Sequence, residues 1–367
     1  MMLFLIIILS IYFTTILLLI YGFSKIKNFN SVGLTPKTAF TIVVPFRNEA
    51  GNLPLLLESF SKLNYPIDLF EVILVDDAST DKFQIPNSKF QISIINNIRI
   101  SKSPKKDAIT TAIPLAKNEW IITTDADCVV SKNWLLTLDN YIQTHKVSMI
   151  ASTVTHSGND SFLHHFQQLD LASLQGATIG SFGIGKGFMC NGANLAYTQS
   201  LFQELNGFEG NNTIASGDDV FLLQKAIASR SFGTEKIHYL KSNNTIVNTK
   251  PLDDWKSLFY QRVRWASKTS SYQSNFGKLL GLVVFGGNIS LLFIVCCLLF
   301  RIGDFYSLLF FIITKSLIDF ILIYKTNQFL KIRTQSFLLS SLLYPFFSAT
   351  VALYAVLGKY EWKGRWF

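Results

Sequence analysis

The chain is poor in charged residues. Lys, Arg, Asp and Glu make up 16% of its 367 residues, against about a quarter in an average soluble domain. Hydrophobic residues make up 49%, which excludes a disordered chain and indicates a soluble domain joined to a membrane region. The net charge is +9, but the basic residues are scattered and many flank apolar runs. This pattern favours membrane lipids, and not nucleic acid, as partners.

Cysteine and histidine are also scarce. The four cysteines form no CxxC pair and no Cys/His zinc spacing, which excludes a disulfide framework and fits a reducing compartment. The adjacent pair His164 and His165 lies on a predicted helix, where successive side chains diverge, so a metal role is disfavoured. The sequence shows no Ser/His/Asp arrangement typical of nucleophilic catalysis.

Four apolar runs are long enough to cross a bilayer, which takes roughly 20 helical residues. The first, Met2–Gly22, carries no charged side chain, and Lys25 and Lys27 follow it in place of a cleavage site. This predicts an uncleaved anchor with the next segment in the cytoplasm. The other three runs are Leu279–Phe300, Phe305–Tyr324 and Ser336–Leu357.

Charges near the last three runs bear on topology. Lys315 and Asp319 are spaced i, i+4, so they can pair instead of facing lipid. The predicted loop Lys325–Arg333 carries three positive charges, which places it in the cytoplasm. The basic tail at 358–367 then falls outside, so whether Leu279–Phe300 crosses fully is left open. We expect a multi-pass protein of the cytoplasmic (inner) membrane.

The region between the first and second runs alternates between two patterns. Helical spacing occurs over Leu53–Leu63, from Lys105, over Val220–Ala228 and near Asp253. Apolar strand-like runs are Phe40–Phe46, Phe70–Val75, Gln91–Ile95 and Glu119–Thr124. Strands separated by helices predict an α/β fold with a mainly parallel sheet, whose ligands bind beyond the carboxyl ends of the strands.

Three acidic pairs are the strongest candidates for a site. Asp125 and Asp127 follow one predicted strand, and Asp76-Asp77 follows another. Carboxylates at a strand end suit Mg²⁺ or Mn²⁺, which can bridge to the phosphates of a nucleotide. The third pair, Asp218-Asp219, precedes a predicted helix, where capping explains one acid better than two. For Asp125 and Asp127 the bland alternative is a surface turn or a cap.

Other polar groups accompany the acids. Lys105 suits a diphosphate as a point charge. Gly192 permits close backbone approach, and the side-chain amides of Asn191 and Asn194 suit hydroxyl-rich ligands, with an ordinary turn as the alternative. Downstream, Gln261, Arg264 and Trp265 fall on one helical face with Arg262 turned away. An indole can stack on a sugar ring while guanidinium and amide groups hold phosphate or hydroxyls. A helix lying on the membrane surface explains the same run, and both roles are compatible.

Six motifs in order, VVPFRNE, VDDAST, SPKKDA, TTDADC, SGDD and QRVRW, span about Phe40 to Trp265. The series resembles that of the membrane-bound inverting glycosyltransferases, the large family 2 type that includes cellulose, chitin and hyaluronan synthases. The resemblance implies a GT-A, Rossmann-like fold, a nucleoside-diphosphate sugar donor and Mg²⁺ or Mn²⁺. The apolar runs and the span of the motifs together predict an anchor at 1–24, a cytoplasmic glycosyltransferase domain at 38–278, a transmembrane region at 279–357 and a basic tail at 358–367.

The resemblance assigns roles by position. Asp219 would be the catalytic base; Asp218 stands where the family usually has Glu, which makes its own role less certain. Asp125 and Asp127 would contact ribose, metal and diphosphate. The nucleotide-sugar would be bound by Pro45, Glu49, Asp76, Asp77, Lys105 and Asp125, and the acceptor and diphosphate side would be lined by Asn191, Asn194, Asp218, Gln261, Arg264 and Trp265.

The acceptor is harder to read from the sequence. We expect transfer onto a lipid-linked or membrane-presented glycan acceptor for cell-envelope synthesis, with a processive polysaccharide synthase as the alternative. A sugar nucleotidyltransferase, a nucleotide-binding membrane receptor and a polytopic scaffold are further alternatives, but none of them needs both a base at Asp219 and the Gln-x-x-Arg-Trp helix.

Overall fold

The computed structural model describes residues 2–85, 87–158, 160–212, 214–358, 360–362 and 365–366. The chain divides into two compact units. Residues 27–157 and 189–250 form one, here called the sheet unit. Residues 1–26, 158–188 and 251–367 form the other, here called the helical unit. Residues 158–188 and 251–278, which lie within the predicted domain of residues 38–278, thus belong to the helical unit by their contacts. The bounds of the functional domain stay a prediction.

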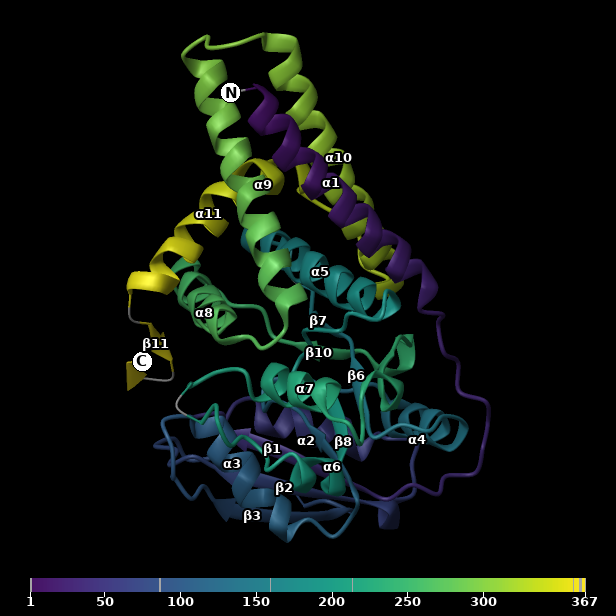
Figure 1. The fold of residues 1–367 in the computed structure, drawn as a ribbon. Helices are drawn as coiled ribbons and strands as arrows, with labels where there is room; N and C mark the ends of the chain where they lie inside the picture. Colours follow the sequence, from purple (N-terminus) through teal and green to yellow (C-terminus); the bar gives the residue numbers. More distant parts are fainter. Residues whose placement is uncertain are drawn as a thin grey trace. The chain divides into compact units, whose positions relative to one another are not determined.

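The sheet unit is built on a seven-stranded sheet of order β3-β2-β1-β4-β8-β6-β9 (Figure 1). Its strands are β1 (Phe40–Phe46), β2 (Phe70–Asp76), β3 (Gln91–Asn96), β4 (Trp120–Thr123), β6 (Met149–Ser152), β8 (Leu195–Thr198) and β9 (Ile237–Leu240). All neighbouring pairs are parallel except those of β8, which runs antiparallel to β4 and β6. The predicted α/β fold with a mainly parallel sheet is confirmed.

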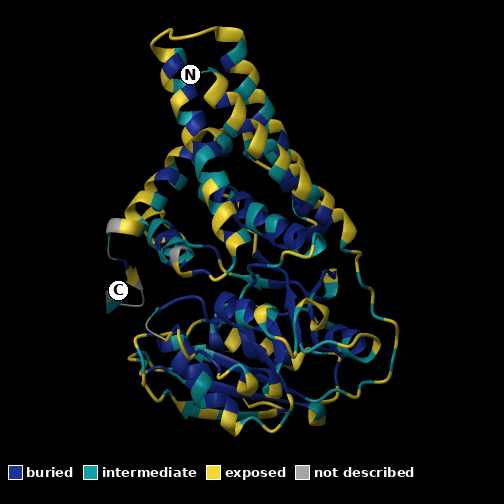
Figure 2. Cartoon of the chain, in the orientation of Figure 1, coloured by how far each residue is buried: buried dark blue, intermediate teal, exposed yellow. Residues whose placement is uncertain are grey.

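Helices cover both faces of the sheet. The central strands are apolar at almost every position, so they present apolar side chains to both faces. Phe40, Ile42 and Val44 of β1 enter the main core, where Phe60 of α2 (Leu53–Ser61) stacks on Trp134 of α4 (Trp134–Thr144). On the other face, α3 (Pro104–Ala112) packs against β1 and β2. Figure 2 shows the central strands as almost wholly buried.

The rest of the sheet unit consists of shorter elements. They are α6 (Gln199–Glu204), α7 (Asp218–Ala228), the small sheet of β5 (Cys128–Val129), β10 (Val247–Thr249) and β7 (Val154–His156), and the 3-10 turns Ile67–Leu69, Ile113–Leu115, Thr234–Lys236 and Asn243–Thr245. Because β1, β2, β3 and β4 run parallel, the loops that follow them lie at one edge of the sheet.

In the part of the helical unit that the structure describes, four helices are long and apolar enough to cross a membrane: α1 (Met2–Lys25), α9 (Asn275–Leu299), α10 (Phe305–Leu330) and α11 (Phe337–Leu357). One lies at the N-terminus and three lie towards the C-terminus, as predicted. The unit also holds α5 (Phe162–Gly183), α8 (Trp255–Ser267), the turn Thr269–Ser271 and the hairpin of β11 (Glu361–Trp362) and β12 (Arg365–Trp366).

Glycines let α5 pack closely on α1. A methyl group on Gly180 or Gly183 of α5 would overlap the backbone carbonyls of Leu19 or Gly22 of α1. Small residues allow this backbone approach in membrane helices too. Helix α5 is therefore part of the helical unit, although its polar residues make it read as part of a soluble domain.

Two expectations about α10 had different outcomes. The predicted pairing of Lys315 with Asp319 is confirmed, at 2.8 Å from Nζ to Oδ2, and Asp319 also accepts a hydrogen bond from Tyr12 Oη of α1 at 2.5 Å. The predicted loop Lys325–Arg333 is wrong over most of its length, since α10 continues to Leu330. No glycine or proline interrupts that stretch, and the helix ends only where Lys331 adopts a left-handed conformation.

Candidate active site

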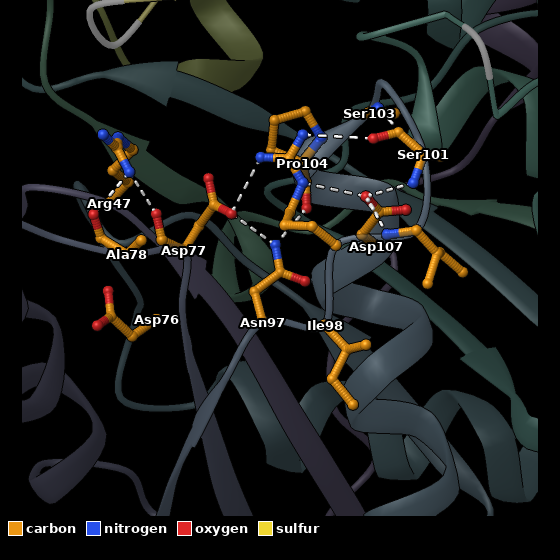
Figure 3. A network of polar contacts seen from close by, with 12 residues as sticks. Arg47, Asp76, Asp77, Ala78, Asn97, Ile98, Ser101, Ser103, Pro104 and Asp107 are labelled. Carbon is orange, nitrogen blue, oxygen red and sulfur yellow. Dashed lines mark hydrogen bonds and ion pairs between the residues drawn. The ribbon is translucent and has the colours of Figure 1, made fainter.

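Asp76 and Asp77 lie at the carboxyl end of β2, where the chain turns sharply. Asp76 Oδ1 accepts hydrogen bonds from the amide and hydroxyl of Ser79, at 2.9 and 2.6 Å. Ala78 has a φ of 57°, a left-handed conformation that is unfavourable for a residue with a side chain. Arg47 Nη1 holds this turn by donating to the carbonyls of Asp77 and Ala78, both at 2.6 Å (Figure 3).

Asp77 belongs to a polar network that joins three loops (Figure 3). Its Oδ1 accepts from Asn97 Nδ2 at 2.7 Å and lies 3.4 Å from Arg99 Nη1. Arg99 Nε also donates to Asp107 Oδ2 at 3.1 Å, and Asp107 accepts from the amides of Ile100 and Ser101. The second acid of the predicted pair is therefore anchored, with an arginine beside it at the strand ends.

The predicted nucleotide-side residues of β1 lie beside this turn. Pro45 pairs in register with Val75 of β2 and is partly exposed. Glu49 is 9% exposed, and its Oε2 accepts from Asn52 Nδ2 at 2.6 Å. Asn48, at a φ of 54°, accepts from the amide of Thr80 at 2.7 Å and so ties the loop after β1 to the loop after β2. The structure brings the two predicted motifs together.

Lys105 lies between two of the acidic pairs. Its Nζ is 2.6 Å from Asp125 Oδ1 and 3.5 Å from Asp218 Oδ2. Burial acts to lower the pKa of Lys105, but the Asp125 and Asp218 carboxylates outweigh it and raise that pKa well above its ordinary value. Lys105 is thus a fixed positive charge at the N-terminus of α3, where helical backbone also favours an anion.

The carboxylates of Asp125 and Asp127 suit a divalent cation. Among the described residues no three His, Cys, Asp or Glu side chains form a ready metal cluster, but Mg²⁺ is usually bound by one or two carboxylates together with substrate phosphates. The ammonium of Lys105 already places a cation against Asp125, whose side chain is 40% exposed, and Asp127 lies two residues on. The donor set therefore fits a metal held by Asp125, Asp127 and a diphosphate.

Cys128 is buried beside this acidic pair, and its Sγ donates to Asp127 Oδ1 at 3.7 Å. Burial first, and then the neighbouring Asp127 and Asp125, raise the pKa of the Cys128 thiol well above its ordinary value.

Asp219 is held close to Gly192. Its Oδ2 accepts from the amide of Gly192 at 2.9 Å, and its Oδ1 accepts from the amide of Val220 at 2.7 Å. Gly192 allows this approach, since a Cβ there would lie 2.7 Å from Asp218 Oδ2 and 3.1 Å from Lys105 Nζ. The glycine singled out from the sequence thus lies against both acids and the lysine.

The two asparagines beside Gly192 differ. Asn191 Oδ1 accepts from the amide of Ala193 at 2.9 Å, which shapes the turn. Asn194 is 2% exposed; its Nδ2 donates to the carbonyls of Thr153 and Thr245 at 2.8 and 2.7 Å, and its Oδ1 accepts from Trp134 at 3.1 Å. With both donors used, Asn194 braces the core, and we no longer assign it to the acceptor side.

The predicted residues Gln261, Arg264 and Trp265 lie on α8, in the helical unit. Arg262, which we expected to point away from them, donates to Gln261 Oε1 and lies over the Trp265 ring, 4.2 Å from its centroid. Its Nε also donates to Asp170 of α5 at 2.5 Å, with both side chains buried. The expectation that Arg262 points away was therefore wrong, since its guanidinium contacts both Gln261 and Trp265.

Four functional candidates were missed from the sequence: Arg47, Asn97, Arg99 and Asp107. Asn97 and Arg99 follow the end of β3, as the acidic pairs follow β2 and β4, and that position was the available signal. Asp107 lies two residues after Lys105 in the same motif. The contacts of Arg47 and Asn97 with Asp77 join loops that are distant in the sequence, so no local sequence pattern indicated them.

Comparison with known proteins finds a matching family and several relatives. Residues 41–205 match the model of glycosyl transferase family 2. The chain is 27% identical over 115 residues to the beta-monoglucosyldiacylglycerol synthase of Nostoc sp., covering 30% of this chain and 25% of that one. It is 29% identical over 112 residues to the poly(ribitol-phosphate) beta-N-acetylglucosaminyltransferase TarS of Staphylococcus aureus, covering 29% of this chain and 19% of that one. The matches thus span a quarter or less of these relatives.

The fold extends the likeness. The mannosyltransferase PcManGT from Pyrobaculum calidifontis, solved in complex with GDP-Man and Mn²⁺, aligns over 95% of this chain and 99% of its own, with a TM-score of 0.55 and 15% identity. At this identity the likeness concerns the fold alone. The sheet unit has a GT-A-like α/β fold, and residues 41–205 are similar in sequence to glycosyl transferase family 2.

Proposed function

We propose that the protein is a membrane glycosyltransferase that moves a sugar, with inversion, from a nucleoside-diphosphate sugar onto an acceptor hydroxyl. The observation that carries the proposal is the placement of Asp219 beside Gly192, in one cluster with Lys105, Asp125 and Asp218. Attack on an anomeric carbon needs a base for the hydroxyl proton and positive charge for the leaving diphosphate. This cluster offers both.

Each group has a distinct task. Asp219 accepts the proton of the acceptor hydroxyl, and the amide of Gly192 fixes the direction of its carboxylate. Lys105 exchanges its contact with Asp125 for the negative oxygens of the diphosphate. A metal ion held by Asp125 and Asp127 would supply further positive charge for the diphosphate. A single displacement on the side opposite the leaving group inverts the anomeric centre.

The base and ribose are assigned to the loops after β1 and β2. Asp76, Asp77 and Glu49 lie at or just after those strand ends, and Pro45 is the second-last residue of β1. Arg99 adds a cation whose side chain is 35% exposed. Gln261, Arg264 and Trp265 are assigned to the acceptor and diphosphate side by resemblance.

We place the sheet unit in the cytoplasm, because Lys25 is the last residue of α1 and Lys27 follows it. The acceptor is proposed to be lipid-linked or membrane-presented, for cell-envelope glycan synthesis. Four candidate membrane helices support this, as do the names of the two relatives, a glycolipid synthase and a transferase to a phosphate polymer.

Paired variants separate the roles. Asp219→Asn removes the proton acceptor and should lower turnover by about 1,000-fold, with donor binding nearly unchanged. Asp127→Ala should instead weaken metal-dependent nucleotide binding. Turnover is measured as nucleoside diphosphate release, and binding by titration with UDP or GDP. A near-wild-type rate for Asp219→Asn would move the base to Asp218.

The size of the product distinguishes transfer of a single sugar from processive polymer synthesis. With a radiolabelled sugar, we expect one lipid-extractable product that carries a single added sugar. A ladder of lengthening chains made by purified protein would replace this proposal with a processive polysaccharide synthase.

A further inference from the structure

Lys106 is one of the most deeply buried charged side chains of the sheet unit. It is 1% exposed, whereas its neighbour Lys105 faces the acidic cluster. Burying an ammonium group away from water is unfavourable unless protein groups replace its hydration. The proposed reaction does not use Lys106, so its burial needs another explanation.

The contacts of Lys106 flank the two acids in the sequence. Its Nζ donates to the carbonyls of Asn211 and Ile214, at 2.7 and 3.0 Å. It also lies 4.8 Å from the centroid of the Phe221 ring. The carbonyls belong to the loop that leads into α7, and Phe221 lies in the first turn of α7. Lys106 therefore contacts the chain just before and just after Asp218-Asp219.

The adjacent lysines of α3 divide their contacts. Successive helical side chains point about 100° apart, so Lys105 reaches Asp125 and Asp218 while Lys106 reaches the loop. Helix α3 thus does two things. It holds the Lys105 ammonium on the proposed diphosphate side, and through Lys106 it holds the backbone that leads to Asp219.

We propose that Lys106 is a positioning residue that sets the location of Asp219 through the loop and the first turn of α7. The inference rests on the proposed transferase function. An apolar residue at this place would take the Nζ donor away from both carbonyls, so that the Asn211 carbonyl would keep only the amide of Ile214, at 3.3 Å. The loop would then turn these carbonyls towards water. Asp219 would then move relative to Lys105, although every group that touches donor or acceptor would still be present.

The test is Lys106→Met in the full chain in its membranes, with Lys225→Met as the matched control. Lys225 also donates to two carbonyls of this loop, those of Gly207 and Glu209 at 2.8 and 3.2 Å, but at the end remote from the acids. Nucleoside diphosphate release is measured with UDP-glucose, UDP-N-acetylglucosamine and GDP-mannose, and thermal unfolding reports the folded fraction.

Lys106→Met should lower kcat by about 100-fold, the effect of roughly 1 Å of misplacement, with the KM for the donor within about twofold of wild type. Lys225→Met should keep wild-type kcat, and Lys105→Met should raise the KM for the donor. If Lys106→Met does not fold, Lys106→Gln, which retains an N–H donor on a shorter side chain, should fold with kcat lowered at least about tenfold.

Three results would overturn the inference: wild-type kcat in folded Lys106→Met or Lys106→Gln, equal losses in the Lys106 and Lys225 variants, or a loss of Lys106→Met activity that appears only as a higher donor KM. Failure of the proposed function is distinguishable, because Asp219→Asn would then retain its rate whatever Lys106→Met does.

Discussion

Gly192→Ala is the sharpest single test of the acidic cluster. The added Cβ would lie 2.7 Å from Asp218 Oδ2, 3.1 Å from Lys105 Nζ and 3.5 Å from Asp219 Cβ. Carbon and oxygen atoms do not approach that closely without bonding, so the Asp218 carboxylate must retreat by several tenths of an ångström. The backbone at Gly192 is not in a left-handed conformation, so alanine adds little strain of its own.

Two effects of this change can be separated. Overpacking typically costs about 1–3 kcal/mol of stability, which for a domain of this size lowers Tm by about 2–4 °C per kcal/mol. Displacement of the groups around the reacting centre is more serious, and we expect kcat/KM to fall about 10- to 100-fold. The variant should thus be largely folded at 25 °C but poorly active.

The assay is nucleoside diphosphate release per folded enzyme, with Gly158→Ala as the control, because a Cβ at Gly158 meets nothing within 4 Å. Gly192→Ala with activity within about twofold of that control would refute the reasoning, since it would mean that the cluster tolerates movement.

Two further predictions concern the helical unit. Asp170→Asn leaves the buried guanidinium of Arg262 without its counter-ion, 2.5 Å away in the native protein, and should cost about 3–5 kcal/mol; thermal unfolding measures this, and an unchanged Tm would contradict the pairing. Gly183→Ala would place a methyl group against the Gly22 carbonyl and should lower the yield of folded protein in membranes. Gly281→Ala, whose nearest new contact is 3.6 Å, should leave that yield unchanged, and equal yields for both variants would argue against close α1–α5 packing.

The strands were the most predictable part of the fold. Phe40–Phe46 was predicted with the bounds that β1 has, and β2 and β3 each extend one residue further than predicted. Short apolar runs that end at polar residues carry this information locally. Two of the acidic pairs, Asp76-Asp77 and Asp125 with Asp127, were found for the same reason, because they stand at the ends of such runs.

The sequence revealed less about residues whose partners lie far along the chain. Asn194 has a side chain of a type that often binds ligands, yet its amide is hydrogen-bonded to Thr153, Thr245 and Trp134. Asp170 and Arg262 are 92 positions apart, and no local pattern links them. Pairings of this kind depend on which elements the fold brings into contact, and a single sequence does not record that.

The central claim, metal-dependent transfer with inversion, is tested most directly by incubating membranes that contain the full chain with a panel of nucleoside-diphosphate sugars, with and without EDTA, and determining the linkage of the product by NMR. We predict nucleoside diphosphate release with at least one donor, loss of release with EDTA, and a product whose anomeric configuration is opposite to that of the donor. Absence of metal-dependent release with every donor, in protein shown to be folded, or a product with retained configuration, would contradict the account.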